Sequence, residues 1–250
     1  MRPVRPIPWD IYEEHLDEAA FLWWQWERAL DAANYTLDEV IDGPEERLRA
    51  HLDGLVLGGA RVAERLLLPA LGDDDPGKVA AATWALLAGE DADHLEAVFE
   101  ALTKAEKNET RAAMGRAFEL CQRADLGARL LPRFEPSAPG VQAVIVNAVS
   151  AEAERRAAAG SGALPATTKE ARTAALPLEA LLRSRHPELL VAALRALRRA
   201  RDPELAALVE GPLGSPYVAV RDAAIETGLI LGMPGASRAC NKLVARNAPG

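Results

Sequence analysis

The sequence has few cysteines, few aromatic residues and no long apolar run. Its two cysteines, Cys121 and Cys240, are far apart and form no CxxC pair. Such a pattern is typical of buried free thiols in a reducing cytoplasm rather than of a disulfide-stabilised secreted domain. No apolar run approaches the roughly 18 residues of a membrane span, and no apolar segment of a secretory signal follows the first arginines. We therefore expect a cytoplasmic protein that does not contact a membrane.

The sequence also lacks the pattern of β-strands. No window shows the strict alternation of Val, Ile, Thr and aromatic residues that a half-buried strand needs. The chain is instead 49% hydrophobic and rich in Ala and Leu, with 18 Gly and 17 Pro dispersed along it. Dispersed Gly and Pro are typical of many short helices separated by turns. The sequence thus predicts an all-α protein with essentially no β-sheet.

One helical hairpin occurs twice near the C-terminus. Residues 186–209 and 215–244 each open on a polar residue followed by proline, continue as an Ala/Leu/Val helix, break, and begin a second helix. The opening prolines, Pro187 and Pro216, are 29 residues apart, a spacing within the range of helical repeats. Neither hairpin can bury its apolar face alone, so neighbouring hairpins must stack. We expect an α-solenoid of stacked HEAT-like hairpins.

The chain divides into three parts by composition. Residues 1–150 are predicted to form an N-terminal helical region with a Trp-rich first helix and HEAT-like hairpins. Residues 151–175 are rich in Ala, Gly and Ser, with almost no large apolar residue, and predict a frayed helix and a flexible loop. Residues 176–250 are predicted to form the C-terminal HEAT-like repeats.

Several helix boundaries can be predicted from capping residues. Asp10 is an expected N-cap for the first helix, and Thr36 with Glu39 forms a capping-box pattern. Gly43-Pro44 is expected to stop one helix and start the next, which should end at Gly58-Gly59. Asp75-Pro76 is expected to open a hairpin of helices at 76–89 and 92–104.

Four of the five tryptophans, Trp9, Trp23, Trp24 and Trp26, fall within 18 residues. On a helix, Trp24 and Trp26 point about 100° and 300° round from Trp23, so one apolar stripe cannot bury all three. Either neighbouring helices cover the first helix on two sides, or Trp24 or Trp26 anchors a protein partner, because Trp is enriched at interface hot spots.

Two segments carry a resemblance to a known family. Residues 13–59 resemble the start of an uncharacterised bacterial family of HEAT-like proteins that are often encoded near type VI secretion genes, and residues 224–240 resemble its Gly-Leu-x-Leu-Gly hairpin. The chain departs from the family by inserting Gly43-Pro44 before HLDGL. The resemblance implies a helical-repeat adaptor or chaperone for a secretion effector or spike component, and it supplies no catalytic residue. It rests on His15, the stretch 19–23, the step 35–37, Glu46-Arg47 and the stretch 51–55.

No signature of an enzyme is present in the sequence. Each histidine is followed two residues later by an acidic residue, a pattern that suggests metal ligands, yet positions i and i+2 of a helix point about 200° apart. Metal-binding helices use spacings of three or four residues. We therefore expect no cofactor and no metal, and interpret His51 and Asp53 as polar groups that bond backbone at a helix–helix corner. The four histidines followed by an acidic residue in this way are His15, His51, His94 and His186.

Charge argues for a protein partner rather than for nucleic acid. Six arginines cluster between Arg183 and Arg201, but the net charge of −8 repels polyanions, and we interpret the cluster as a solvated helix face. A nucleic-acid-binding protein or a metal-dependent helical-repeat enzyme remains the alternative from another class.

Two acidic loops suggest a basic partner. If both lie along one edge of the solenoid, they form an electronegative strip suited to a basic toxin, which would make the chain an immunity protein; otherwise they only cap helices. The C-terminal edge, with Ala239, Cys240 and Leu243, is a further candidate surface, for self-association. The acidic residues are Asp73, Asp74, Asp75, Glu90, Asp91 and Asp93.

Overall fold

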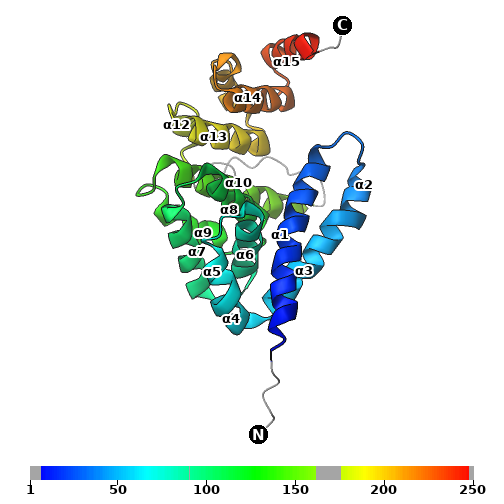
Figure 1. Cartoon of the computed structure of the whole chain (residues 1–250). Helices are drawn as coiled ribbons and strands as arrows, with labels where there is room; N and C mark the ends of the chain where they lie inside the picture. Colours follow the sequence, from blue (N-terminus) through cyan, green and yellow to red (C-terminus); the bar gives the residue numbers. More distant parts are fainter. Residues whose placement is uncertain (1–6, 90, 162–175, 248–250) are drawn as a thin grey trace. The chain divides into compact units, whose positions relative to one another are not determined.

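The structure is a computed structural model that describes residues 7–89, 91–161 and 176–247. All regular secondary structure in these ranges is helical, which confirms the all-α prediction. The chain forms two compact units, Met1–Arg123 and Ala124–Gly250 (Figure 1). Within the described ranges, no helix has the length and apolarity needed to cross a membrane.

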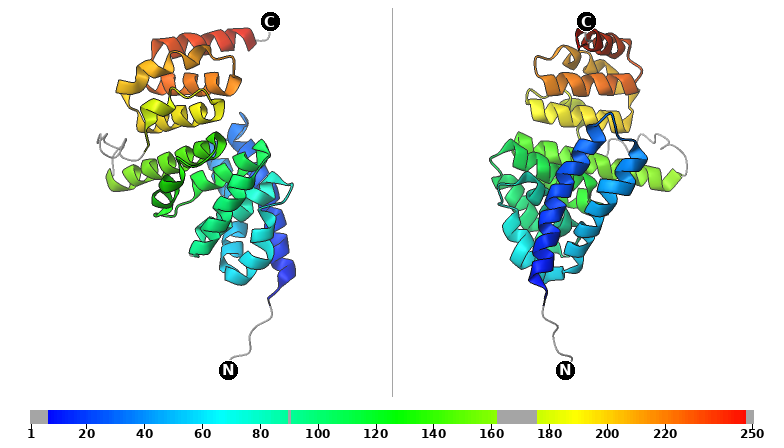
Figure 2. Two further views of the ribbon diagram at one scale, coloured as in Figure 1. Left: turned by 90° about the vertical axis from the view of Figure 1, so that its left-hand side faces the viewer. Right: turned by 45° about the vertical axis from the view of Figure 1, so that its right-hand side comes forward.

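In the first unit, two long helical segments lie side by side (Figures 1 and 2). The first is α1 (Trp9–Asp31), and the second runs without interruption through α2 (Leu37–Val40), η1 (Ile41–Glu45) and α3 (Glu46–Leu57). The Thr36 capping box is present as predicted. The predicted N-cap at Asp10 is wrong: the N-cap is Pro8, two residues earlier, and Asp10 lies in the first turn of α1. Its negative charge still favours the helix N-terminus there.

The predicted break at Gly43-Pro44 is also wrong. Both residues lie inside η1, a π-helical turn that joins α2 to α3 directly. A proline has no N–H to donate and its ring crowds the carbonyl four residues earlier, so the wider π-helical turn accommodates Pro44 where an ordinary α-helical turn would not. The segment ends before Gly58-Gly59 as predicted, where Gly59 has a φ of +63°.

The core of the first unit is built around one alanine-rich helix. After α4 (Gly59–Val62), η2 (Ala63–Leu67) and α5 (Leu68–Ala70), the predicted hairpin is present as α6 (Pro76–Ala88) and α7 (Ala92–Lys104), followed by α8 (Asn108–Leu120). Helix α6 packs against α1, α3, α7 and α8. Its small side chains at 79–82 are fully buried, and they let neighbouring helices approach from several sides.

In the second unit, long helices pack in chain order. Helix α10 packs on α13, α13 on α14 and α14 on α15, and the last three form successive layers in Figure 2. Apolar residues of α10, including Ile145 and Val146, are fully buried. The elements are α9 (Leu126–Leu130), η3 (Leu131–Arg133), α10 (Pro139–Ser161), α12 (Leu178–Leu181), α13 (Pro187–Ala200), η4 (Pro203–Val209), η5 (Pro212–Gly214), α14 (Val218–Ile230) and α15 (Pro234–Asn247).

The two predicted copies of the hairpin differ in the structure: the second is a pair of packed α-helices, α14 and α15, and the first is not. Helices α13 and α14 pack on each other and bury apolar residues of both copies, whereas Val191 of α13 is half-buried. The second limb of the first copy is not an α-helix: Asp202 caps a 3-10 segment, η4, by accepting a hydrogen bond from the backbone N–H of Glu204. The buried set is Leu194, Leu197, Val220, Ala224 and Ile225.

The two units meet at Arg123–Ala124 in the sequence, whereas composition placed the division in 151–175. The physical reason is that α10 continues through Ser161 and buries its apolar residues against α13, so that residues 139–161 belong to the second unit. Residues 162–175, which include most of the expected loop, lie outside the described residues.

Candidate functional site: a tryptophan-lined cleft in the first unit

A cleft with a volume of about 1020 Å³ opens among the helices of the first unit. Its walls come from α1, from η1 and α3, from α6 with the following Gly89, and from the end of α8 and the residues after it. Three of the five tryptophans line it. The lining residues are Trp23, Trp26, Glu45, Leu48, Arg49, Leu52, Asp53, Trp84, Ala88, Gly89, Leu120, Gln122 and Arg123.

The two tryptophans from α1 are held by carboxylates. The indole N–H of Trp23 donates to Oε1 of Glu27 at 3.1 Å, and that of Trp26 donates to Oε2 of Glu45 at 3.1 Å. Their rings meet edge to face, with centroids 6.1 Å apart. Because both N–H groups already have acceptors, these rings offer the cleft fixed apolar surface rather than hydrogen-bond donors.

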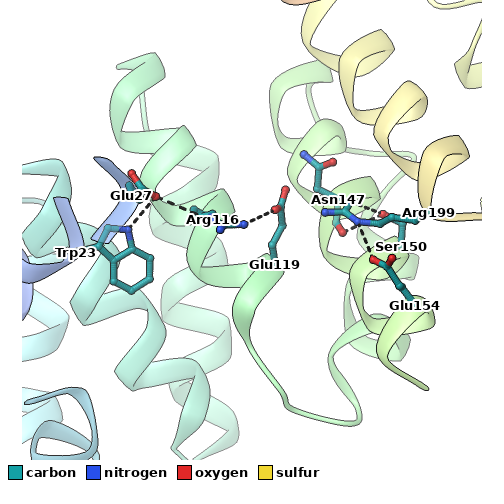
Figure 3. Close-up of polar contacts among 8 residues, drawn as sticks. All are labelled: Trp23, Glu27, Arg116, Glu119, Asn147, Ser150, Glu154 and Arg199. Atoms are coloured by element: carbon teal, nitrogen blue, oxygen red, sulfur yellow. Dashed lines mark hydrogen bonds and ion pairs between the residues drawn. The ribbon is translucent and has the colours of Figure 1, made fainter. Parts of the chain in front are cut away.

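Arg116 of α8 also helps to hold the tryptophan rings of α1 in place. Its guanidinium lies between Glu27 and Glu119, with Nε 3.9 Å from Glu27 Oε1 and a terminal nitrogen 3.3 Å from Glu119 Oε2 (Figure 3). The same guanidinium lies 5.2 Å from the centroid of the Trp26 ring, a cation–π distance. Contacts between α1 and α8 therefore fix the aromatic wall of the cleft.

Trp84, on α6, is the tryptophan that the cleft leaves most open. It is half-buried, while Trp23 and Trp26 are only 3% and 7% exposed. Leu48, Leu52 and Leu120 add aliphatic surface to the same cleft. Trp84 was not predicted as a site residue, although it is a single large aromatic residue within the alanine-rich stretch 79–88.

Charged residues of both signs line the cleft. On the side of η1 and α3, Arg49 lies 4.0 Å from Glu45, and Asp53 follows Leu52 at an exposed position on the rim. After α8, Arg123 donates from its guanidinium to the carbonyl oxygen of Gly89 at 3.1 Å. The cleft can therefore take an apolar side chain against its aromatic surface and polar or charged groups beside it.

The two tryptophans predicted as partner anchors have different environments. Trp24 is 54% exposed, lies outside the cleft, and carries the guanidinium of Arg28 4.5 Å from its ring centroid. Trp26 lines the cleft but is almost completely buried. Neighbouring helices thus cover α1 on the sides of Trp23 and Trp26, while Trp24 and Phe21 remain exposed.

The first acidic loop precedes α6, and its carboxylates serve local structure. Asp75 is the N-cap of α6 and accepts from the backbone N–H of Gly77 at 2.8 Å, while Asp73 accepts from the N–H of Asp75. Asp74 lies 2.5 Å from the Lys107 ammonium, and this hydrogen bond lowers the pKa of Asp74 and raises that of Lys107.

The second acidic loop lies at the other end of α6. Asp91 is the N-cap of α7 and accepts from the backbone N–H of Asp93 at 2.8 Å; its other oxygen lies 3.8 Å from His94. Glu90 lies outside the described residues. Because the 13 residues of α6 separate the loops by about 20 Å along the helix, the structure does not bring them together as one strip.

Two histidines from different helices meet. Nδ1 of His15 on α1 lies 3.0 Å from Nδ1 of His51 on α3, with the ring planes at 73°. His51 lies where α1 packs on α3, but its hydrogen bond is to the His15 side chain and not to backbone as predicted. Sequence spacing within one helix could not reveal a pair formed between two helices. No group of three or more His, Cys, Asp or Glu side chains in the described part of the chain is arranged to hold a metal ion.

The arginine cluster of the second unit is distributed among acidic partners. Arg183 pairs with Glu179, and Arg198 pairs with Glu226. Arg199 donates to Ser150 Oγ at 3.0 Å and lies 3.4 Å from Glu154, which joins α13 to α10 (Figure 3). These contacts orient three of the arginines toward protein carboxylates.

Comparisons with known proteins do not identify a family for this chain. A scan against models of protein families gives no match, and no curated protein matches the sequence significantly.

Proposed function

We propose that this chain is a non-catalytic protein-binding scaffold, built as a HEAT-like α-solenoid, whose partner inserts an apolar side chain into the Trp84 cleft. The repeated hairpin and the consecutive packing of α10, α13, α14 and α15 support the solenoid. Helical-repeat proteins use extended surfaces of this kind to bind other proteins.

The observation that carries the proposal is the combination of surfaces in the cleft. Trp84 is half-buried beside Leu48 and Leu52, and the fixed rings of Trp23 and Trp26 add further aromatic surface. Concave apolar surfaces with a few polar groups are typical binding sites, and pockets of this kind receive the buried anchor residues of protein interfaces. Because the supporting carboxylates already fix the wall, binding costs little ordering of these side chains.

The family resemblance suggests the biological setting. It supports an adaptor or chaperone that presents an effector or a spike component to type VI secretion machinery, acting in the cytoplasm before export. The free thiols of Cys121 and Cys240 favour a reducing compartment. An immunity protein for a basic toxin remains the second candidate, favoured by the net charge of −8.

The test is co-expression with the type VI effectors and spike components encoded in the same genome. We expect one effector or spike component to co-purify with the wild-type chain, and Trp84→Ala to weaken that complex at least about tenfold, as for an interface hot spot. Affinity should be measured by calorimetry on the purified pair.

Trp24→Ala is the matched control, since it removes an equally large ring that lies outside the cleft. If Trp24→Ala abolishes binding and Trp84→Ala does not, the partner binds the outer face of α1 and the cleft proposal fails. Capture of a basic toxin whose activity the chain inhibits would favour the immunity role.

A further inference from the structure

The contact between His15 and His51 connects the two helices that carry much of the cleft. His51 directly precedes Leu52 and Asp53, which line the cleft from α3, and α1 contributes Trp23 and Trp26. The His15 ring lies against the backbone of α3, where a Cβ on Gly54 would come within 3.0 Å of His15 Nε2. A glycine at this position lets the ring approach closely enough to reach His51.

The chemistry of the pair depends on its protons. A separation of 3.0 Å between the two Nδ1 atoms is that of an N–H···N hydrogen bond, in which one imidazole donates and the other accepts. The bond therefore requires that one Nδ1 carry no proton. A doubly protonated pair would place two N–H donors and two positive charges face to face, and the contact would be repulsive.

The charged groups around the pair come from the same two helices. Burial lowers the pKa of His51, and the charge of His15 lowers it further; Arg47 on α3 acts in the same direction, while Glu18 and Glu14 on α1 oppose it. The net direction is downward, so the folded protein resists a proton that the unfolded chain accepts near pH 6.5. Stability from this contact is complete above that pH and is lost as the pH falls through the folded-state titration.

We propose that His15 and His51 form an acid-sensitive latch between α1 and α3, which keeps the cleft in its binding shape at neutral pH and releases it in mild acid. The effect on partner binding rests on the proposed function of the cleft, whereas the latch itself does not. The two levels are therefore tested separately.

The latch is tested on the protein alone. Between pH 7.5 and 5.5, we expect the Tm of the wild type to fall by about 3 °C more than that of His51→Gln, in which the amide still offers a hydrogen bond but cannot become charged. His15→Gln is the second variant. His186→Gln is the matched control, because His186 lies in the second unit and its side chain makes no capping hydrogen bond to α13. An equal pH dependence in the wild type and both pair variants would overturn the latch.

Proton NMR of the ring protons provides an independent readout. In the wild type, burial and the charge of His15 should hold the pKa of His51 below its ordinary value, and replacing His15 by Gln should move the pKa of His51 back toward that value. An ordinary pKa of His51 in the wild type contradicts the proposal even if a variant fails to fold.

The consequence for the cleft is measured with the captured secretion partner. We expect affinity to fall about tenfold from pH 7.5 to 5.5 for the wild type, and by much less for His51→Gln. If no partner binds at any pH, the proposed function fails while the latch is still judged from Tm and NMR. If the affinity for the partner has the same pH dependence in the wild type and in His51→Gln, the latch does not control binding in the cleft.

Discussion

The backbone N–H of Gly127 donates a hydrogen bond of 2.6 Å to Oε2 of Glu152, 25 residues later in the chain. Gly127 lies in the first turn of α9, where backbone N–H groups have no partner inside the helix, and Glu152 is a buried acid of α10. The other carboxylate oxygen of Glu152 pairs with Arg156. The acid thus fixes the start of α9 against α10.

Gly127→Ala tests this contact. A Cβ at position 127 would come within 2.5 Å of Glu152 Oε2, so the carboxylate must move and its hydrogen bond to the backbone must lengthen. We expect a loss of about 1–3 kcal/mol in the free energy of unfolding, measured by urea denaturation. Gly160→Ala, in α10 with no atom within 4 Å of the added Cβ, is the control and should be neutral or stabilising by up to about 1 kcal/mol. Equal effects at the two positions would contradict the assigned role of Glu152.

Leu194→Ala tests the stacking of α13 and α14. Leu194 is fully buried, and its carbonyl accepts a hydrogen bond of 3.0 Å from the hydroxyl of Thr227 on α14. Removing a buried leucine side chain should cost about 2–5 kcal/mol, measured by chemical denaturation. Val191→Ala, at a half-buried position of the same helix, should cost clearly less. A loss below about 0.5 kcal/mol at Leu194 would show that the two helices do not pack as described.

The ion pair between Lys78 and Asp17 should make a small, salt-dependent contribution. Lys78 Nζ on α6 lies 2.7 Å from Asp17 Oδ1 on α1, and this hydrogen bond raises the pKa of Lys78. A raised lysine pKa gives stability that is complete below about pH 10.4 and is lost as the pH rises through the folded-state value. Since Asp17 is largely exposed, Asp17→Asn should cost at most about 1 kcal/mol at pH 7 and almost nothing in 1 M NaCl. Thermal melts at both salt concentrations measure this difference; an undiminished cost in 1 M NaCl would mean that Asp17 acts by something other than charge.

The C-terminal helix offers a test of self-association. Leu243 is half-buried, as are Ala239 and Cys240, whereas Val244 is 64% exposed. If a second copy covers this edge, Val244→Glu should convert an associating wild type into a monomer with little effect on its Tm, because the side chain is mostly exposed. Leu243→Glu should instead lower the Tm. Light scattering across a concentration series measures association, and a wild type that remains monomeric at high concentration would exclude this interface.

The helices were predictable where a local signal coincides with a helix end. The Thr36 capping box, the Asp75-Pro76 start of α6 and the Gly58-Gly59 end of α3 each depend on a few neighbouring residues, and the structure has all three. The prediction was wrong at Gly43-Pro44, since the sequence signal for a break is the same whether the chain turns away or continues through a π-helical turn.

The candidate site was much less predictable. Trp26 was predicted as a possible partner anchor, yet the fold covers it and leaves Trp84, from a different helix, as the open ring of the cleft. The two acidic loops are close in the sequence, which suggested that they form one surface. In the structure they lie at opposite ends of α6.

The sequence alone therefore determined the helical content, many helix ends and the buried seam between α13 and α14, because these follow from local propensity and from the period of apolar residues. Tertiary structure alone decided which side chains from different helices meet. Trp84 shares a cleft with Trp23 and Trp26 only because α6 packs beside α1, and His15 reaches His51 only because α1 lies along α3. The periodicity of one helix fixes which residues share its face, but the partner of that face is set by how the helices pack.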